Sequence, residues 1–166
     1  IHNSTNLIIN NITLTNVNGI ILSRVNNSIL YDLNINVTAI GLAPLQIMQY
    51  STNNIFYNIS LHSNISTTGS IVLYNTNNNN FTNLTSDSRG GVLTATTSNN
   101  NSISDSLILG TSYTHFVFNS GNNFTLTNIG TTRAGNIAIN LGTTASNITF
   151  NNVSLWATNT EYFLFN

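Results

Sequence analysis

Few side chains in this sequence can take part in acid–base or metal chemistry. The 166 residues include three histidines, three Lys or Arg residues, four acidic residues and no cysteine. The four acids lie far apart in the sequence: Asp32, Asp87, Asp105 and Glu161. Of these acids, only Asp87 is separated from a histidine, His62, by a number of residues that can bring the two together in the fold. Arg89 lies close to Asp87 in the sequence. A histidine beside a carboxylate can act as a general base, so the fold must decide whether these residues meet.

The chain repeats itself about every 23 residues, and each copy opens with an Asn-rich turn before an apolar residue. Examples of this turn are Asn53-Asn54-Ile55, Asn79-Asn80-Phe81 and Asn122-Asn123-Phe124. A first apolar column recurs at the same period: Ile8, Ile29, Ile55, Phe81, Ile103, Phe124 and Ile148. A second column follows it: Ile12, Leu33, Ile59, Leu84, Leu107, Ile129 and Val153. Such a repeat is one coil of a solenoid, which buries its apolar face by stacking on the next copy.

The local pattern predicts strands rather than helices. Segments such as Ile12-Thr13-Leu14 and Ile59-Ser60-Leu61 alternate apolar and polar residues, which places the apolar side chains on one face of a strand. A third short strand follows in each copy, usually after a glycine, as in Gly69-Ser70-Ile71-Val72-Leu73. We therefore expect an all-β solenoid of about seven coils with three short strands per coil, forming one domain over residues 1–166.

The repeat brings His62 and Asp87 together. Each stands three residues after a member of the second column, Ile59 and Leu84, so the two should lie one above the other on adjacent coils. No second carboxylate or histidine completes a metal site there. A surface pair without catalytic function is the simpler interpretation. We expect no enzymatic activity, no metal site and no cofactor.

Asparagine is the commonest residue, at 34 of 166 positions, and it gathers where the chain must bend. Asn tolerates the left-handed backbone region and bonds to nearby backbone groups. One polar residue precedes each member of the second column: Asn11, Asp32, Asn58, Asn83, Ser106, Asn128 and Asn152. Stacking at about 4.8 Å per coil would let these side chains bond in a ladder that fixes the register.

The repeated sequence pattern, as in Asn53 to Leu61 followed by Gly69 to Leu73, resembles that of the right-handed parallel β-helix family. This family includes pectate lyases, periplasmic copper-site maturation proteins, viral tailspikes and archaeal surface proteins. The resemblance covers nearly the whole chain, from about Asn6 to Phe165. It implies a right-handed coil, but it specifies a fold and not an activity. Family hydrolases use clustered Asp residues, and the acids of this chain are not clustered.

Charge and composition exclude several classes of partner. Lys and Arg total three and Asp and Glu total four, whereas about a quarter of the residues of an ordinary domain are charged. Three dispersed arginines cannot neutralise the phosphate backbone of a nucleic acid, so we expect no nucleic-acid binding. No apolar stretch approaches the roughly 18 residues of a membrane span, so we expect no membrane insertion.

Attached glycans would give this uncharged surface its solubility. The Asn-x-Ser/Thr motif occurs twelve times, at Asn3, Asn11, Asn26, Asn36, Asn58, Asn64, Asn80, Asn83, Asn100, Asn123, Asn147 and Asn152. In motifs such as Asn58-Ile59-Ser60 the apolar middle residue points inward, so Asn and hydroxyl point outward together. We expect several of these sites to be glycosylated in an exported protein. The alternative is that the asparagines serve only as a structural ladder.

The sequence also predicts self-association. It begins with Ile1 and contains no helix to cover a terminal coil, so we expect both ends of the solenoid to be open. An open coil is a template for adding another chain, and unlike ends that pair head to tail form a filament. The final residues Tyr162, Phe163, Leu164 and Phe165 are apolar or aromatic on both strand faces, which marks them as the assembly interface. The alternative is that these 166 residues are one segment of a longer solenoid.

The function expected from these features is that of a structural, glycosylated subunit of an extracellular filament or cell-surface layer. Its expected partners are further copies of itself and its own glycans. A second interpretation rests on Tyr31 and Tyr57, which should stack on adjacent coils with Trp156 and Tyr113 also exposed. Outward aromatic rings can stack on sugars, as in a glycan-binding adhesin or a tailspike-like module. A polysaccharide-modifying enzyme ranks third.

Overall fold

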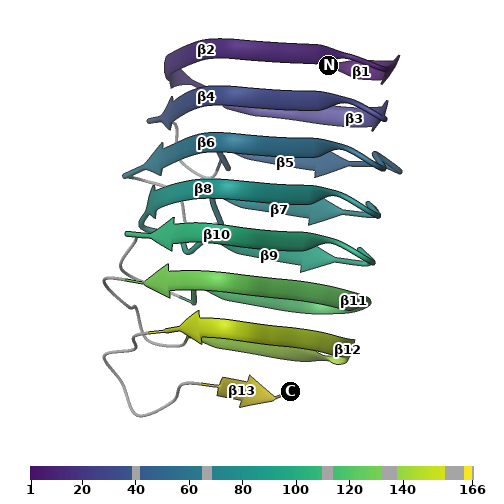
Figure 1. The fold of residues 1–166 in the computed structure, drawn as a ribbon, viewed down its shortest axis with the longest axis vertical. Helices are drawn as coiled ribbons and strands as arrows, with labels where there is room; N and C mark the ends of the chain where they lie inside the picture. The colour runs from purple at the N-terminus through teal and green to yellow at the C-terminus, as the bar shows by residue number, and fades with distance from the viewer. Residues whose placement is uncertain (39–41, 65–68, 110–113, 132–137, 156–162, 166) are drawn as a thin grey trace.

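The chain forms a parallel β-solenoid of about six turns without helices among the residues described (Figure 1). The structure is a computed structural model, and it describes residues 1–38, 42–64, 69–109, 114–131, 138–155 and 163–165. The fold class expected from the repeat is therefore confirmed. The turn count is close to the expected seven.

Thirteen strands make up the solenoid. They are β1 (His2–Thr5), β2 (Ile8–Val17), β3 (Ile20–Asn26), β4 (Ile29–Val37), β5 (Leu45–Met48), β6 (Ile55–Ser63), β7 (Ile71–Tyr74), β8 (Asn80–Ser88), β9 (Leu93–Thr96), β10 (Ser102–Ile108), β11 (Phe116–Thr131), β12 (Ile139–Ser154) and β13 (Phe163–Phe165). Strands β2, β4, β6, β8 and β10 stack along one side of the solenoid, and strands β1, β3, β5, β7 and β9 stack behind them (Figure 1). Each of the strands β11 and β12 runs along both sides of the solenoid as a single long strand. All pairings are parallel, as expected when each coil repeats the path of the one before.

The core is a continuous apolar column between the two sides. One line of buried side chains runs through Leu30, Phe56, Phe81, Ile103 and Leu126, which pair from strand to strand in register. The rings of Phe56 and Phe81 stack with their centroids 4.6 Å apart. Since each coil contacts only its neighbours, this column is what joins the coils into one cooperative unit.

The first apolar column expected from the sequence is wrong in its first three members. Ile8 is 70% exposed and Ile55 is 44% exposed, and both point outward. Their register partner in β8 is Asn80, not Phe81. The inward residues are the next ones along, Leu30 and Phe56, because successive side chains of a strand face opposite sides. Phe124 is buried, but it lies two positions before Leu126, which is the residue that pairs with Ile103 of the inward column.

The second column is confirmed in Leu33, Ile59, Leu84 and Ile129 but is wrong at Leu107. Leu107 is 43% exposed, and it pairs with Thr85 and Gly130 on the outer face. Ser106 takes the inward position instead and pairs with Ile129. Its hydroxyl donates to the Ser104 carbonyl at 2.6 Å and accepts from the Leu84 N–H at 3.1 Å. These bonds satisfy a polar group that is otherwise surrounded by apolar side chains.

Asparagine bends each coil twice through left-handed backbone. One column of residues with positive φ is asparagine throughout: Asn6, Asn27, Asn53, Asn78, Asn100, Asn123 and Asn147. A second lies five residues further on: Asn11, Asp32, Asn58, Asn83, Asp105, Asn128 and Asn152. Asp105 therefore stands where the sequence pattern suggested Ser106. Asn and Asp adopt this conformation at lower cost than other side chains, which accounts for their abundance here.

Gly121 occupies a bend that no other residue fits. Its φ is +126°, and an added Cβ would lie 2.0 Å from the Ser98 carbonyl oxygen. We expect Gly121→Ala to lower the free energy of unfolding by about 1–3 kcal/mol in chemical denaturation, because both the backbone and the neighbouring coil must shift. Gly130→Ala is the control, since its added Cβ would meet nothing nearer than a Leu107 side-chain atom at 3.7 Å. Equal losses for the two variants would contradict this interpretation.

Candidate functional site

A buried column of polar side chains, which we call the inner ladder, runs through four successive coils of the described structure. It consists of Ser28, Asn54, Asn79 and Asn101 on successive coils, and all four residues are at most 1% exposed. Each directly follows a left-handed asparagine, so the bend turns its side chain into the interior. The sequence analysis missed this ladder. Its signal was the Asn-Asn doublet, of which the first member bends the chain and the second is buried.

The inner ladder satisfies its own buried polar groups. Asn54 donates its backbone N–H and its amide to Asn79 Oδ1, at 3.2 and 3.0 Å. Asn79 donates to Asn101 Oδ1 in the same two ways, at 2.9 and 3.1 Å. The second N–H of each amide reaches a backbone carbonyl, such as that of Ser51 from Asn79 at 3.2 Å. Buried polar groups bonded in this way fix the register of neighbouring coils.

A second column, the corner ladder, lies on the exposed left-handed bend. Asn58 donates to Asp32 Oδ1, and Asn83 donates to Asn58 Oδ1 at 3.3 Å. Further along the stack, Asn128 donates to Asp105 Oδ1 at 2.7 Å and Asn152 donates to Asn128 Oδ1 at 2.9 Å. The ladder expected from the sequence is therefore confirmed in two runs of three residues, Asp32–Asn58–Asn83 and Asp105–Asn128–Asn152, with Asp105 in place of Ser106.

The twelve candidate glycosylation sites are distributed along the outside of the solenoid. Ten of these asparagines are exposed: Asn3, Asn11, Asn58, Asn64, Asn80, Asn83, Asn100, Asn123, Asn147 and Asn152. Asn26 and Asn36 are half-buried. In the motif at Asn26, the third residue Ser28 is buried in the inner ladder. Modification of any of them stays a prediction.

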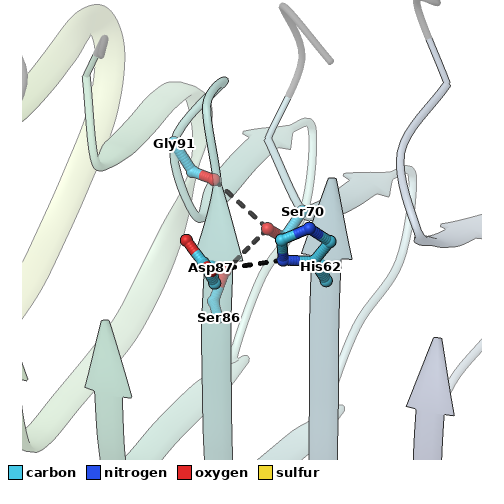
Figure 2. A network of polar contacts seen from close by, with 5 residues as sticks. All are labelled: His62, Ser70, Ser86, Asp87 and Gly91. Carbon is cyan, nitrogen blue, oxygen red and sulfur yellow. Dashed lines mark hydrogen bonds and ion pairs between the residues drawn. The ribbon is translucent and has the colours of Figure 1, made fainter. Parts of the chain in front are cut away.

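The His62–Asp87 pair is present. The two residues pair in register across β6 and β8, and His62 Nδ1 lies 3.2 Å from Asp87 Oδ2 (Figure 2). The side chains are 32% and 50% exposed. Ion pairs at such exposure contribute about 0–1 kcal/mol to stability, so this pair is not an important structural element.

A serine lies close in Figure 2 but does not complete a catalytic triad with this pair. Ser70 Oγ is buried and bonds to Ser86 Oγ at 2.6 Å and to the Gly91 carbonyl at 3.3 Å. Ser86 and Asp87 are consecutive in a strand, so their side chains lie on opposite faces. Ser70 is therefore on the inner face with Ser86, and His62 is on the outer face with Asp87.

Two further features of the described part of the chain bear on function. No group of three or more His, Cys, Asp or Glu side chains is placed to hold a metal ion there. None of its elements is a helix long and apolar enough to cross a membrane.

An aromatic pair stands on the outer face of β4 and β6. The rings of Tyr31 and Tyr57 lie parallel within 5° with centroids 4.7 Å apart, and Asn10 donates its amide to the Tyr31 hydroxyl. Tyr57 is 37% exposed. The stacking expected from the sequence is confirmed here, whereas Trp156 and Tyr113 lie outside the described residues.

An open polar groove runs along the corner ladder. It has a volume of about 340 Å³, and its walls include Asp32, Asn34, Asn58, Ser60 and Asn83. Amides, hydroxyls and one carboxylate thus line a channel that crosses several coils.

The chain matches no protein-family model, and no curated protein matches it.

The expected assembly residues are described only in part. Tyr162 lies outside the described residues, while Phe163, Leu164 and Phe165 form β13 and pair with Ile139, Asn140 and Leu141 of β12. Their role in assembly stays a prediction.

The tyrosine pair gives a testable pH dependence. Desolvation raises the pKa of the Tyr57 hydroxyl above its usual 10.0, and the nearby Tyr31 and Asp32 raise it further. A raised pKa favours the neutral form in the folded protein, so its contribution to stability is complete below pH 10 and is lost as the pH rises through the folded pKa. We expect Asp32→Asn to lower the pKa of Tyr57 in a spectroscopic phenolate titration. The distant Asp105→Asn should leave it unchanged, and the same shift in both variants would contradict this cause.

Proposed function

We propose that this chain is a rigid, N-glycosylated structural unit of an extracellular filament or cell-surface layer, in which further coils stack on its own. The observation that carries this proposal is the parallel pairing that continues through all thirteen strands of the described structure, with register shifts at Thr15/Val17 and at Phe118/Ser120. The same positions bond from coil to coil through the backbone, the inner ladder and the corner ladder. The same proposal includes a relationship to pectate-lyase-like and archaeal surface proteins, which the repeated sequence pattern suggests.

The edge of β2 supports stacking of a second copy. In this column the backbone N–H points toward the preceding coil, since Ile29 donates to the Leu7 carbonyl and Ile55 donates to the Ser28 carbonyl. Ile8 occupies the same column in β2, which pairs with β4 alone in the described structure. Its N–H is therefore directed to the place where another coil would lie. An edge of this kind readily accepts a further strand.

The experiment is to compare assembly of three proteins by sedimentation velocity and electron microscopy. The unchanged protein should form concentration-dependent filaments or layers. Ile8→Pro should abolish them, since it removes an edge N–H without removing a bond between β2 and β4. Ile8→Ala is the matched control and should still assemble, because it keeps that N–H.

The other edge is tested by removing residues 161–166. We expect this truncation to abolish assembly while leaving the earlier coils folded, because each coil contacts only its neighbours. If the unchanged protein stays monomeric at all concentrations, or if the truncated protein forms the same filaments, the head-to-tail proposal is wrong.

The second candidate function is that of a glycan-binding adhesin or tailspike-like module. It is favoured by two separate features, the polar groove along the corner ladder and the parallel rings of Tyr31 and Tyr57 on the outer face. The test is calorimetric titration with soluble β-1,4-glucan and chitin oligosaccharides. Binding that Tyr57→Ala removes and Tyr74→Ala preserves would favour this function over the structural one.

Polysaccharide modification is the third candidate, and the pair of His62 and Asp87 is its basis. Release of reducing sugars from the same oligosaccharides, lost in Asp87→Asn, would support it.

A further inference from the structure

The tyrosine pair stops at Tyr57, and the coil that follows carries a smaller side chain. Tyr57 pairs in register with Thr82 of β8, and Thr82 pairs with Ser104 of β10. Because the rings stack from coil to coil, the face of Tyr57 that Tyr31 does not cover points along the stack toward Thr82. Coils are spaced at about 4.8 Å, so one flat ring fits above Thr82, where a third aromatic ring would stand.

Asn80 lies beside this space. It is exposed, it is on the same face of β8 as Thr82, and the segment Asn80-Phe81-Thr82 is a glycosylation motif. Asn80 Oδ1 accepts a hydrogen bond at 2.7 Å from Ser102 Oγ, which lies on the side of β10. The oxygen and nitrogen of a carboxamide point to different sides. Asn80 Nδ2 is therefore directed away from β10, toward solvent and the coil that carries Tyr57.

We propose that the first sugar of a glycan attached to Asn80 Nδ2 packs against the free face of Tyr57, above Thr82. This inference rests on the proposed glycosylation. The new bond joins Nδ2 to the anomeric carbon of a sugar phosphate donor. The donor's phosphate leaves with the electrons of the broken C–O bond, and Nδ2 loses one proton to solvent. The apolar C–H face of the pyranose then covers an aromatic face that is otherwise in water.

Neighbouring motifs differ from Asn80 in their surroundings. Asn58 and Asn83 donate their amides to the preceding member of the corner ladder, and they stand on adjacent coils. Two glycans about 4.8 Å apart cannot both extend from this ladder without collision. Asn80 has neither constraint, because its register neighbours are Ile55 and Ser102.

The first experiment maps glycans and tyrosine accessibility on protein secreted from yeast. Glycopeptide mass spectrometry should find Asn80 occupied. Nitration by tetranitromethane should then be slower at Tyr57 in this protein than in Asn80→Gln, with no change at Tyr74. Tyr74 is an exposed tyrosine on β7 and serves as the internal control.

The second experiment is a double-mutant cycle in melting temperature, on protein trimmed by endoglycosidase to one N-acetylglucosamine per site. Tyr57→Ala should lower the melting temperature by about 2–4 °C more in the Asn80-glycosylated protein than in the Asn80→Gln background. Tyr74→Ala should lower it equally in both backgrounds.

The outcomes separate this inference from the proposed function. Occupancy at other motifs but not at Asn80, or equal effects of Tyr57→Ala in both backgrounds, would overturn the inference and leave glycosylation standing. Absence of glycans at every motif would overturn both. A third outcome combines two results: free chitin oligosaccharides bind to Asn80→Gln in a Tyr57-dependent way, and the attached glycan does not protect Tyr57 from nitration. The occupant would then be a free saccharide, and the inference would be wrong.

Discussion

Leu84→Asp is expected to unfold the middle of the solenoid, with a loss of at least about 4 kcal/mol in free energy of unfolding. Leu84 is 1% exposed and lies in register with Ile59. A carboxylate there has no cation to pair with in the apolar column, so it must remain protonated or force the coils apart. Urea denaturation followed by circular dichroism measures the loss.

Leu107→Asp is the matched control for that experiment. The same substitution is expected to change stability by about 0.5 kcal/mol or less, because Leu107 lies on the outer face at 43% exposure. A sequence-based alignment of the repeats treats the two leucines as equivalent. Similar losses in the two variants would show that the register described for β10 is wrong.

Asn79→Leu is expected to cost about 3–5 kcal/mol although it conserves volume. Asn79 is fully buried, and its side chain accepts from Asn54 and donates to the Ser51 carbonyl. The substitution leaves a buried N–H and a buried carbonyl without these partners, and each such group costs about 1–3 kcal/mol. The measurement is urea denaturation of unglycosylated protein.

The control is Asn80→Leu, made in the adjacent residue of the same coil. Asn80 is exposed, and its column already holds Ile55 in the preceding coil. We expect a change of about 0.5 kcal/mol or less. If Asn79→Leu proved equally mild, the inner ladder would be a consequence of the register and not a cause of it.

The inner ladder also marks a change along the solenoid. After Asn101 the ladder position passes to the buried Phe124, which packs edge to face against Phe118 at 5.0 Å. Amide bonding thus holds the earlier coils in register, and aromatic packing takes over in β11. Such a change lets a variant at Asn79 act on the earlier coils while leaving the later ones in place.

The fold class and much of the site followed from the sequence alone. Alternation in segments such as Ile59-Ser60-Leu61 has the period of a strand, and only stacking of coils can bury apolar columns repeated about every 23 residues. The same period brought His62 to Asp87 and Tyr31 to Tyr57, since equal offsets within a repeat become neighbours in space.

The facing of particular residues was decided only by the tertiary structure. The distance between equivalent bends varies from 21 residues, between Asn6 and Asn27, to 26, between Asn27 and Asn53. An Asn doublet can therefore be aligned in two ways that differ by one residue. A one-residue slip in a strand turns every side chain to the other face, which explains why Ile55 and Leu107 were placed inward. Which asparagine takes the left-handed bend depends on the hydrogen bonds that the next coil offers, and those exist only once the coils have stacked.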